Sequence, residues 1–197
     1  MPCKIKYVKA SKSGATYLLG ILAEGEDARY KIPSRLYHEL GEPLAGAILT
    51  DEELSEIKIA DEGGRATKKA LSLLSYADVS ERNMVAKLRR SGYSHASATE
   101  AAREMVMHGY IDEHRQLLRL VEREANSNLY GPMRILPKLM QKGYRSDAIK
   151  AAMHELCEDG SVDFVQNAAR LAEKRLAADA TDDDRRALLY KYGYKGR

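Results

Sequence analysis

The chain has 197 residues and a formal net charge of +3, and 44% of its residues are hydrophobic, enough for one or two domains with apolar cores. Charged residues make up 31% and tryptophan is absent, which is more typical of a solvent-rich helical protein than of a compact catalytic domain. No stretch approaches the roughly 18–20 apolar residues of a membrane span, the N-terminus lacks the apolar run of a signal peptide, and two distant cysteines indicate a reduced, cytoplasmic protein.

The first sixty residues predict a small β-rich segment. Residues 4–9 alternate polar with apolar side chains, as a half-buried strand does. Residues 16–22 and 28–32 are rich in strand formers and are separated by turn-forming residues. We therefore expect three strands here.

Two short helices and a linker complete this segment. Ser34 is expected to cap a helix over residues 35–40. Thr50 and Glu53 have the spacing of a capping box, which predicts the start of a second helix. Residues 61–64, with the sequence Asp-Glu-Gly-Gly, are expected to form the linker that follows.

From residue 65 onward the β signal is replaced by apolar residues at helical spacing, and two sequence markers recur in register. The first marker is a Gly-Tyr pair with a leucine four residues before it, repeated at intervals of 51 and 50 residues. The second, Gly-x-(Ile/Val)-Asp, begins 17 residues after each of the first two glycines. The pairs are Gly92-Tyr93, Gly143-Tyr144 and Gly193-Tyr194 after Leu88, Leu139 and Leu189, and the second marker is Gly109–Asp112 and Gly160–Asp163.

These markers predict a repeat of three helices. A glycine after an apolar periodic segment ends a helix at no steric cost, and the next residue can fold back onto that helix. Pro137 falls inside an expected helix, where we anticipate a kink or a late start. The expected helices are 66–76, 80–91 and 95–108, then 112–125, 132–142 and 146–158, and finally 163–178 and 182–191.

The predicted fold is therefore mainly α. It consists of tandem three-helix repeats, two full and a third truncated, in an elongated curved array preceded by the small β-rich N-terminal segment. A long concave surface of this kind suits an extended partner. The expected domains are the β-rich domain 1–60, the linker 61–64, repeats 65–110 and 111–162, and the truncated repeat 163–197.

This arrangement resembles the RecX family of recombination regulators over most of the chain. The sequence departs from the family where Ala77-Asp78-Val79 replaces a stretch with an arginine, at Pro137, and in the shortened third repeat. The resemblance rests on residues 70–76, Ser80-Glu81, Lys87-Leu88, Gly92-Tyr93 and 109–113, on 130–135, Leu139 and 142–144, and on Lys174-Arg175 and 189–194.

The resemblance implies a function in DNA repair, recombination and the SOS response. Members of the family bind the RecA recombinase filament and modulate, most often inhibit, its ATP hydrolysis, growth and strand exchange. Direct contact with single- or double-stranded DNA is also implied. The resemblance implies no cofactor, no small-molecule substrate and no membrane partner.

Basic residues on two expected helices are the candidate partner-binding residues. Residues 1–64 carry 8 Lys/Arg against 11 Asp/Glu, whereas residues 65–110 carry 8 against 4. The basic side chains could contact an acidic protein surface or DNA phosphates, or could simply be solvated helix faces. Tyr130 could stack on a partner or a base, or pack within its turn. The basic candidates are Arg82, Lys87, Arg89 and Arg90 on one helix and Arg134, Lys138 and Lys142, spaced by four, on the other.

Signals of an enzyme are missing from the sequence. The five histidines show no ligand spacing with one another or with cysteine, so no metal site is expected. Neither a phosphate-binding glycine loop nor a nucleophile elbow occurs. The alternative that stays open is a helix-turn-helix-like DNA-binding protein, because a three-helix unit with one basic helix can dock in a major groove.

Overall fold

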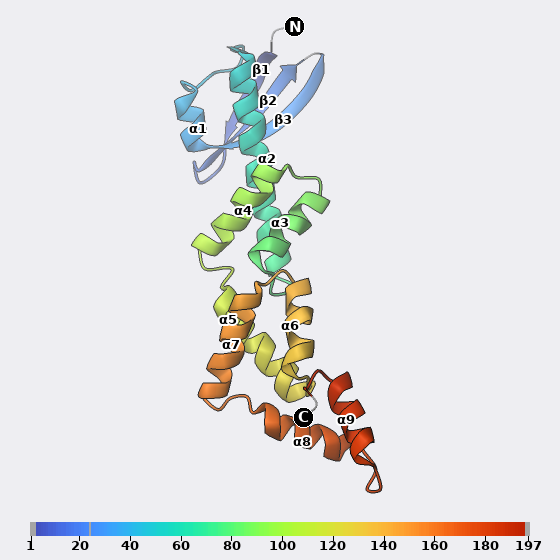
Figure 1. The fold of residues 1–197 in the computed structure, drawn as a ribbon. Coiled ribbons are helices and arrows are strands. Elements are labelled where there is room, and N and C mark those ends of the chain that lie inside the picture. Colours follow the sequence, from blue (N-terminus) through green and yellow to red (C-terminus); the bar gives the residue numbers. More distant parts are fainter. Residues whose placement is uncertain (1–2, 24, 196–197) are drawn as a thin grey trace. The chain divides into compact units, whose positions relative to one another are not determined.

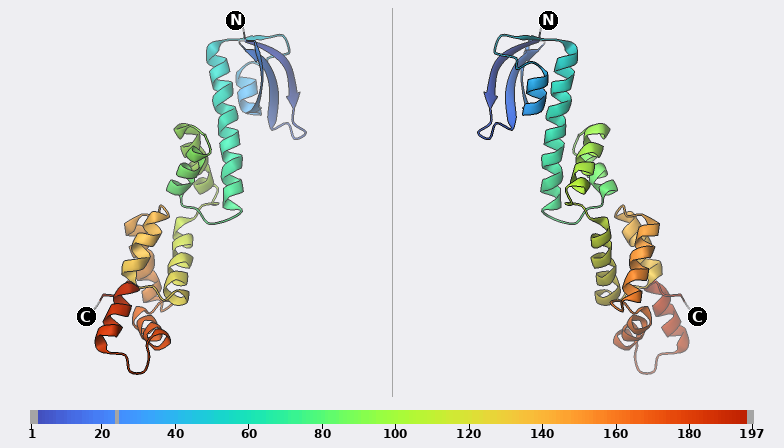
Figure 2. Two further views of the ribbon diagram at one scale, coloured as in Figure 1. Left: turned by 90° about the vertical axis from the view of Figure 1, so that its right-hand side faces the viewer. Right: turned by 90° about the vertical axis from the view of Figure 1, so that its left-hand side faces the viewer.

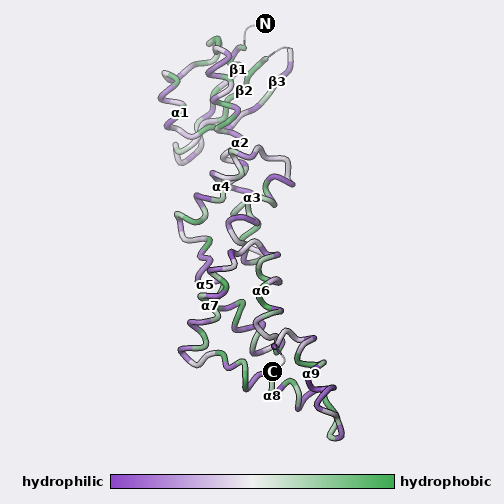
Figure 3. The backbone as a smooth tube through the Cα atoms, viewed as in Figure 1, coloured by the Kyte–Doolittle hydropathy of each residue, from purple (hydrophilic) through white to green (hydrophobic). Residues whose placement is uncertain are grey.

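A computed structural model describes residues 3–23 and 25–195 (Figure 1). Over this range the protein is mainly helical with one small sheet, as the sequence predicts. The chain divides into two compact units, the first comprising Met1–Tyr76 and Met84–Met105, and the second Ala77–Asn83 and Val106–Arg197. Hydrophobic and hydrophilic residues follow one another at short intervals along the helices, as expected for amphipathic helices (Figure 3).

The sheet of the first unit is an antiparallel meander with one added short strand. The strand order is β3-β2-β1-β4, and each neighbouring pair is antiparallel. The three predicted strands are confirmed, while the fourth was missed because two residues are too short to show a period of two. The strands are β1 (Cys3–Ala10), β2 (Thr16–Ala23), β3 (Glu26–Pro33) and β4 (Ile48–Leu49).

Helix α1 (Ser34–Glu39) follows β3 directly, and its cap differs from the prediction. Pro33 occupies the N-cap position and Ser34 is the first helical residue, so the serine does not cap the helix. The predicted capping box at the start of α2 (Asp51–Leu74) is confirmed. The Glu53 amide donates to Thr50 Oγ1 over 3.2 Å, and the Thr50 amide donates to the Glu53 carboxylate over 2.7 Å.

The expected linker at residues 61–64 is wrong, because α2 runs through it without a break. Its buried positions continue at helical spacing on both sides of the two glycines, and this packing outweighs the cost of about 1 kcal/mol for each helical glycine. The first half of α2 lies against the sheet, and its second half lies beside α3 (Glu81–Arg90) and α4 (His95–Met107) (Figure 2).

Two carboxylates of α2 tie it to its neighbours. Asp61, which is 7% exposed, accepts a hydrogen bond from the Lys31 amide over 2.8 Å and pairs with Arg65 at 2.9 Å. Glu62 accepts from the Ser94 amide over 2.7 Å and from the Ser94 and Ser97 hydroxyls over 2.9 and 2.8 Å. These donors at the start of α4 lower the pKa of Glu62, so it remains ionised there.

The second unit contains the remaining helices around an apolar core. Helix α6 begins at Pro132 and contains Pro137, so the anticipated late start does not occur. The other helical bounds lie within a few residues of the predicted ones, except that a π-helical turn, η1, ends the helix expected over 112–125. The elements are α5 (Glu113–Glu122), η1 (Arg123–Ser127), α6 (Pro132–Gln141), α7 (Ser146–Glu158), α8 (Phe164–Arg175) and α9 (Asp182–Lys191).

All three Gly-Tyr pairs end a helix in the same way. Each glycine has positive φ and bonds to the carbonyl three residues earlier, and each tyrosine amide bonds to the carbonyl of the marker leucine. This is the Schellman motif, in which paired bonds satisfy carbonyls at the end of a helix. The tyrosine–leucine bonds are Tyr93 to Leu88 and Tyr144 to Leu139, both 3.3 Å, and Tyr194 to Leu189, 2.9 Å.

The second marker joins one helix to the next. Gly109 and Gly160 have positive φ, the apolar residues Ile111 and Val162 are buried, and each marker then ends on an aspartate. Asp112 accepts from the Arg115 amide at the start of α5. Asp163 accepts from the Val165 and Gln166 amides at the start of α8, so the marker combines a helix end, a buried anchor and an N-cap.

In the second unit, two of the Gly-Tyr turns pack against the start of another helix. A Cβ on Gly143 would meet Ser80 Oγ, and the Ser80 hydroxyl donates to the Lys142 carbonyl over 2.7 Å. Likewise, a Cβ on Gly193 would meet the Arg134 backbone, and the Gly193 carbonyl accepts from the Met133 amide over 3.0 Å. The two contacted helix starts are 51 residues apart in sequence, which is the interval between the markers.

We expect this close approach to make Gly193→Ala more destabilising than a glycine substitution in open space. Gly160→Ala is the matched control, because Gly160 also has positive φ but a Cβ there meets nothing within 4 Å. The control should lose about 1 kcal/mol for the backbone conformation, and Gly193→Ala should lose about 1–3 kcal/mol more for overpacking. Urea unfolding followed by circular dichroism measures both, and equal losses would contradict the contact.

Candidate functional site

The predicted basic residues of α3 lie mostly on the side of the helix that faces solvent. Met84 and Leu88 are buried, and Arg82, Arg89 and Arg90 are exposed on the opposite side. Among the described residues, none of these arginines has a carboxylate within 4.0 Å. Their charge is therefore not neutralised by the parts of the chain described.

Lys87 is half-buried at the flank of α3, and the Arg90 guanidinium donates only to a carbonyl of its own helix, that of Ala86, over 3.3 Å. In the division of the chain, Arg82 belongs to the second unit, whereas Lys87, Arg89 and Arg90 belong to the first. Because Arg82, Arg89 and Arg90 are exposed and have no carboxylate partner among the described residues, we treat them as the candidate surface. We call them the α3 arginines.

The predicted stripe on α6 has a different environment. The exposed side of this helix carries Met133, 47% exposed, and Met140, 48% exposed, rather than basic residues. Lys142 is exposed, but Arg134 and Lys138 lie on the flank of the helix and contact other parts of the second unit. Spacing by four places the three side chains along one line, but it does not determine which line faces solvent.

Lys138 neutralises a buried acid that sequence reasoning missed. Its ammonium lies 2.7 Å from the carboxylate of Glu124, a residue of η1 that is 1% exposed. Asn128 donates to the same carboxylate over 2.8 Å, and Arg123 lies 3.5 Å away. Burial alone would raise the pKa of Glu124, but the bonds from Lys138 and Asn128 together with both positive charges lower it. Lys138 thus has a structural partner.

Arg134 is held between two aromatic rings. Its guanidinium carbon lies 4.1 Å from the ring centre of Tyr130 and 5.5 Å from that of Tyr192, and its Nη1 donates to the Lys191 carbonyl over 3.0 Å. The Lys138 ammonium also lies 4.9 Å from the Tyr130 ring centre. Tyr130, predicted as a possible stacking residue, is therefore already in cation–π contact with two side chains of α6.

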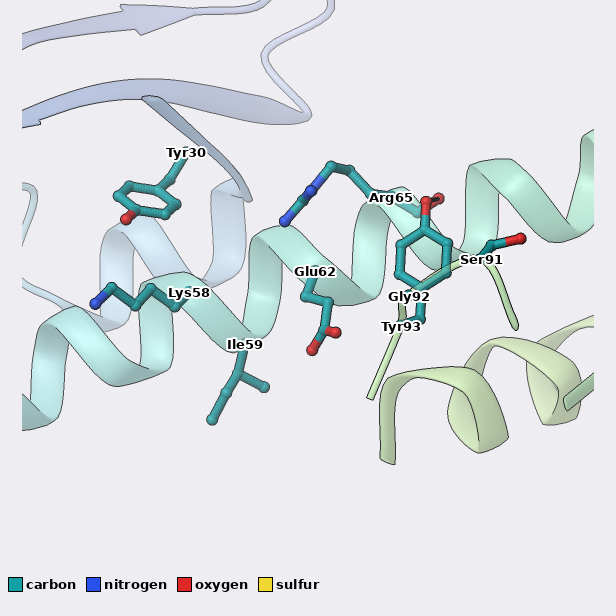
Figure 4. Close-up of a pocket in the computed structure, with 8 residues that line it drawn as sticks. All are labelled: Tyr30, Lys58, Ile59, Glu62, Arg65, Ser91, Gly92 and Tyr93. Carbon is teal, nitrogen blue, oxygen red and sulfur yellow. Dashed lines mark hydrogen bonds between the residues drawn. The ribbon is translucent and has the colours of Figure 1, made fainter. Parts of the chain in front are cut away.

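A cleft in the first unit is lined by aromatic and basic side chains and by the acid Glu62 (Figure 4). It has a volume of about 430 Å³ and lies between β3, α2 and the Gly-Tyr turn after α3. Tyr30, Lys58 and Arg65 line it, while Tyr93 closes one end and donates to the Arg65 carbonyl over 3.2 Å. Because Arg65 already pairs with Asp61, Lys58 is the cation of this cleft without a carboxylate partner among the described residues.

Comparison with known proteins decides the family. No profile of a known protein family matches the chain. A protein of Xanthomonas campestris pv. campestris named regulatory protein RecX is 31% identical over 154 residues, which are 73% of this chain and 92% of that protein. The chain belongs to the RecX family of regulatory proteins. The regulatory protein RecX of Halorhodospira halophila is 30% identical over 135 residues, 68% of this chain and 80% of that protein.

Other RecX proteins are longer or more distant. The chain spans about half the length of the first relatives it matches, for example 54% of the regulatory protein RecX of Lactobacillus gasseri at 25% identity. A crystal structure of a regulatory protein RecX has a TM-score of 0.72 at 22% identity and covers 98% of this chain and 95% of its own. The structure of RecX from Lactobacillus salivarius has a TM-score of 0.60 over 69% of this chain and 90% of its own. These two likenesses concern the fold.

The described part of this RecX-family chain has neither a metal-binding cluster nor a helix that could cross a membrane. Over residues 3–23 and 25–195, there is no cluster of three or more His, Cys, Asp or Glu side chains that could hold a metal ion. Within the same residues, every helix is too short or too polar to cross a membrane.

The contrast between the two lysines of α6 can be tested by their effect on stability. Lys138→Met leaves the buried Glu124 without its closest cation, and we expect the free energy of unfolding to fall by about 2 kcal/mol. Lys142→Met, the control at the C-cap of the same helix, should change it by less than about 0.5 kcal/mol, because the Lys142 side chain is exposed. Urea unfolding at pH 7 measures both, and an equal effect of the two substitutions would show that the Glu124 pair is not structural.

Proposed function

We propose that this chain binds the filament of the RecA recombinase and inhibits its ATP hydrolysis, growth and strand exchange in recombination and DNA repair. The observation that carries the proposal is membership of the RecX family, at 31% identity over 92% of a relative named as a regulatory protein. A regulator of this kind needs a surface for its partner and no reaction centre. The naming of the relatives as regulatory proteins fits a non-enzymatic role.

The α3 arginines are the part of the predicted basic surface that best suits such a contact. Arginine forms strong, bidentate bonds with carboxylates and phosphates, and an arginine without an internal partner loses no existing ion pair on binding. Arg134 and Lys138 fit less well, because each would have to leave an aromatic or carboxylate partner within the second unit. We therefore propose that the contact lies on Arg82, Arg89 and Arg90 of α3.

Recombinase assays test the proposal directly. The full chain, titrated into RecA on single-stranded DNA, should reduce ATP hydrolysis and strand exchange at less than one chain per RecA monomer, regardless of DNA sequence. The variant Arg82→Glu/Arg89→Glu/Arg90→Glu should need at least about a hundredfold more protein for the same inhibition, since each of the three lost charged contacts costs about 1 kcal/mol or more. The charge-matched control is Lys69→Glu/Lys150→Glu/Arg185→Glu, whose three residues are exposed on other helices.

The outcomes separate the alternatives. Inhibition that is weakened by the α3 variant but not by the control supports both the function and the surface. If the unaltered chain leaves ATP hydrolysis and strand exchange unchanged over the whole titration, the function is wrong. Binding to a defined DNA sequence with strong base preference, without an effect on RecA, would favour the helix-turn-helix-like alternative.

A further inference from the structure

A small cavity in the second unit lies between the end of η1, the end of α8 and the third Gly-Tyr turn. Its volume is about 160 Å³. Its lining includes Ser127 and Asn128, Lys174 and Arg175 of α8, and Tyr192. This volume exceeds the roughly 30 Å³ of a water molecule and falls below the roughly 300 Å³ of sites for drug-sized molecules. The size suits a single small group.

The charge of the cavity is positive. Lys174 and Arg175 are exposed in the last turn of α8, and no carboxylate belongs to the lining. Neither cation lies within 4.0 Å of a carboxylate in the described part of the chain. Glu124, whose carboxylate accepts a hydrogen bond from the lining residue Asn128, is buried and also bonded to Lys138, whereas the exposed Glu173 beside Lys174 is not part of the lining. The two free charges are therefore available to an anion that enters the cavity.

Two segments that line the cavity have uncommon backbone conformations. The π-helical turn η1 forms one wall, and π-helical turns occur frequently at functional sites. Leu129, also in the lining, is buried and has a φ of 55°, a left-handed conformation that costs a non-glycine residue free energy. Its carbonyl accepts from the buried Tyr194 hydroxyl over 3.2 Å, so the third Gly-Tyr turn holds this strained wall in place. A preformed wall lowers the cost of ordering a site when a ligand binds.

We infer that this cavity is a binding site for a dianionic phosphate group, with Lys174 and Arg175 as its charged ligands. A phosphomonoester carries nearly two negative charges at neutral pH, which matches the two cations. Arginine can bond two phosphate oxygens at once, lysine adds a point charge, and the Ser127 hydroxyl can donate to a third oxygen. A single phosphate fits the volume, whereas a nucleoside attached to it would remain outside the cavity. The inference does not depend on recombinase binding.

Calorimetric titration of the full chain with inorganic phosphate at fixed ionic strength tests the site. The unaltered chain should bind phosphate, and Lys174→Gln/Arg175→Gln should bind it at least about tenfold more weakly, because two charge-assisted contacts are lost. The control Lys150→Gln/Arg185→Gln removes the same charge from exposed positions outside the cavity and should bind as the unaltered chain does. Equal affinity of the cavity variant and the control would overturn the inference. Circular dichroism checks that both variants are folded.

Competition with hexathymidylate, with and without a 5′-phosphate, identifies the source of the group. Displacement of inorganic phosphate at pH 7.5 by the phosphorylated form alone supports a terminal phosphate of nucleic acid, because that form alone carries a phosphomonoester. Displacement by neither form supports free phosphate as the ligand. Equal displacement by both forms would overturn the inference, because a phosphodiester chain would then suffice. The RecA assay is separate, so failure of either result leaves the other interpretable.

Discussion

The second unit depends on one backbone constraint, which is the Schellman turn at Gly143-Tyr144 and again at Gly193-Tyr194. The turn requires a residue with positive φ, and the amide of the next tyrosine reaches back to the leucine four residues before the glycine. Gly143 and Gly193 also touch the starts of other helices, so a Cβ at Gly193 would meet the Arg134 backbone and one at Gly143 would meet the Ser80 hydroxyl. The tyrosines then fill the space beside the turns. The hydroxyl of Tyr144 reaches Gln116, and burial raises the pKa of Tyr144 to about 12.

The parts of the fold that could be predicted from the sequence are those set by interactions between residues close together in the chain. The three long strands, the capping box at Thr50 and the helix ends at the Gly-Tyr pairs follow from short-range rules about spacing, caps and φ. Residues 61–64 did not follow such rules, because the apolar pattern of α2 continues through two glycines and tertiary packing outweighs their low helix propensity. The partner of Lys138 could not be read from the sequence either. Glu124 lies 14 residues earlier, within a π-helical turn that no pattern indicated.

For the charged residues of the candidate surface, too, the sequence alone does not show which side chains face solvent without a partner. The helices α3 and α6 precede equivalent Gly-Tyr turns, and equivalent positions on them differ in chemistry, because Arg82 and Arg89 correspond to Met133 and Met140. At equivalent positions of the repeat, α3 thus exposes an arginine to solvent, whereas α6 exposes a methionine. Sequence spacing groups these cations into one predicted set, but only burial and partners separate those without an ion-pair partner among the described residues from those that stabilise the second unit.

The bond from the Lys31 amide to Asp61 has a consequence for the solubility of the first unit. β3 is an edge strand, and unpaired amides on such an edge can recruit a strand of another molecule and begin aggregation. The Asp61 carboxylate occupies one of these amides, and Pro33, two residues further along the same edge, has no N–H to offer. The carboxylate that fastens α2 to the sheet therefore also protects the open side of the sheet from intermolecular pairing.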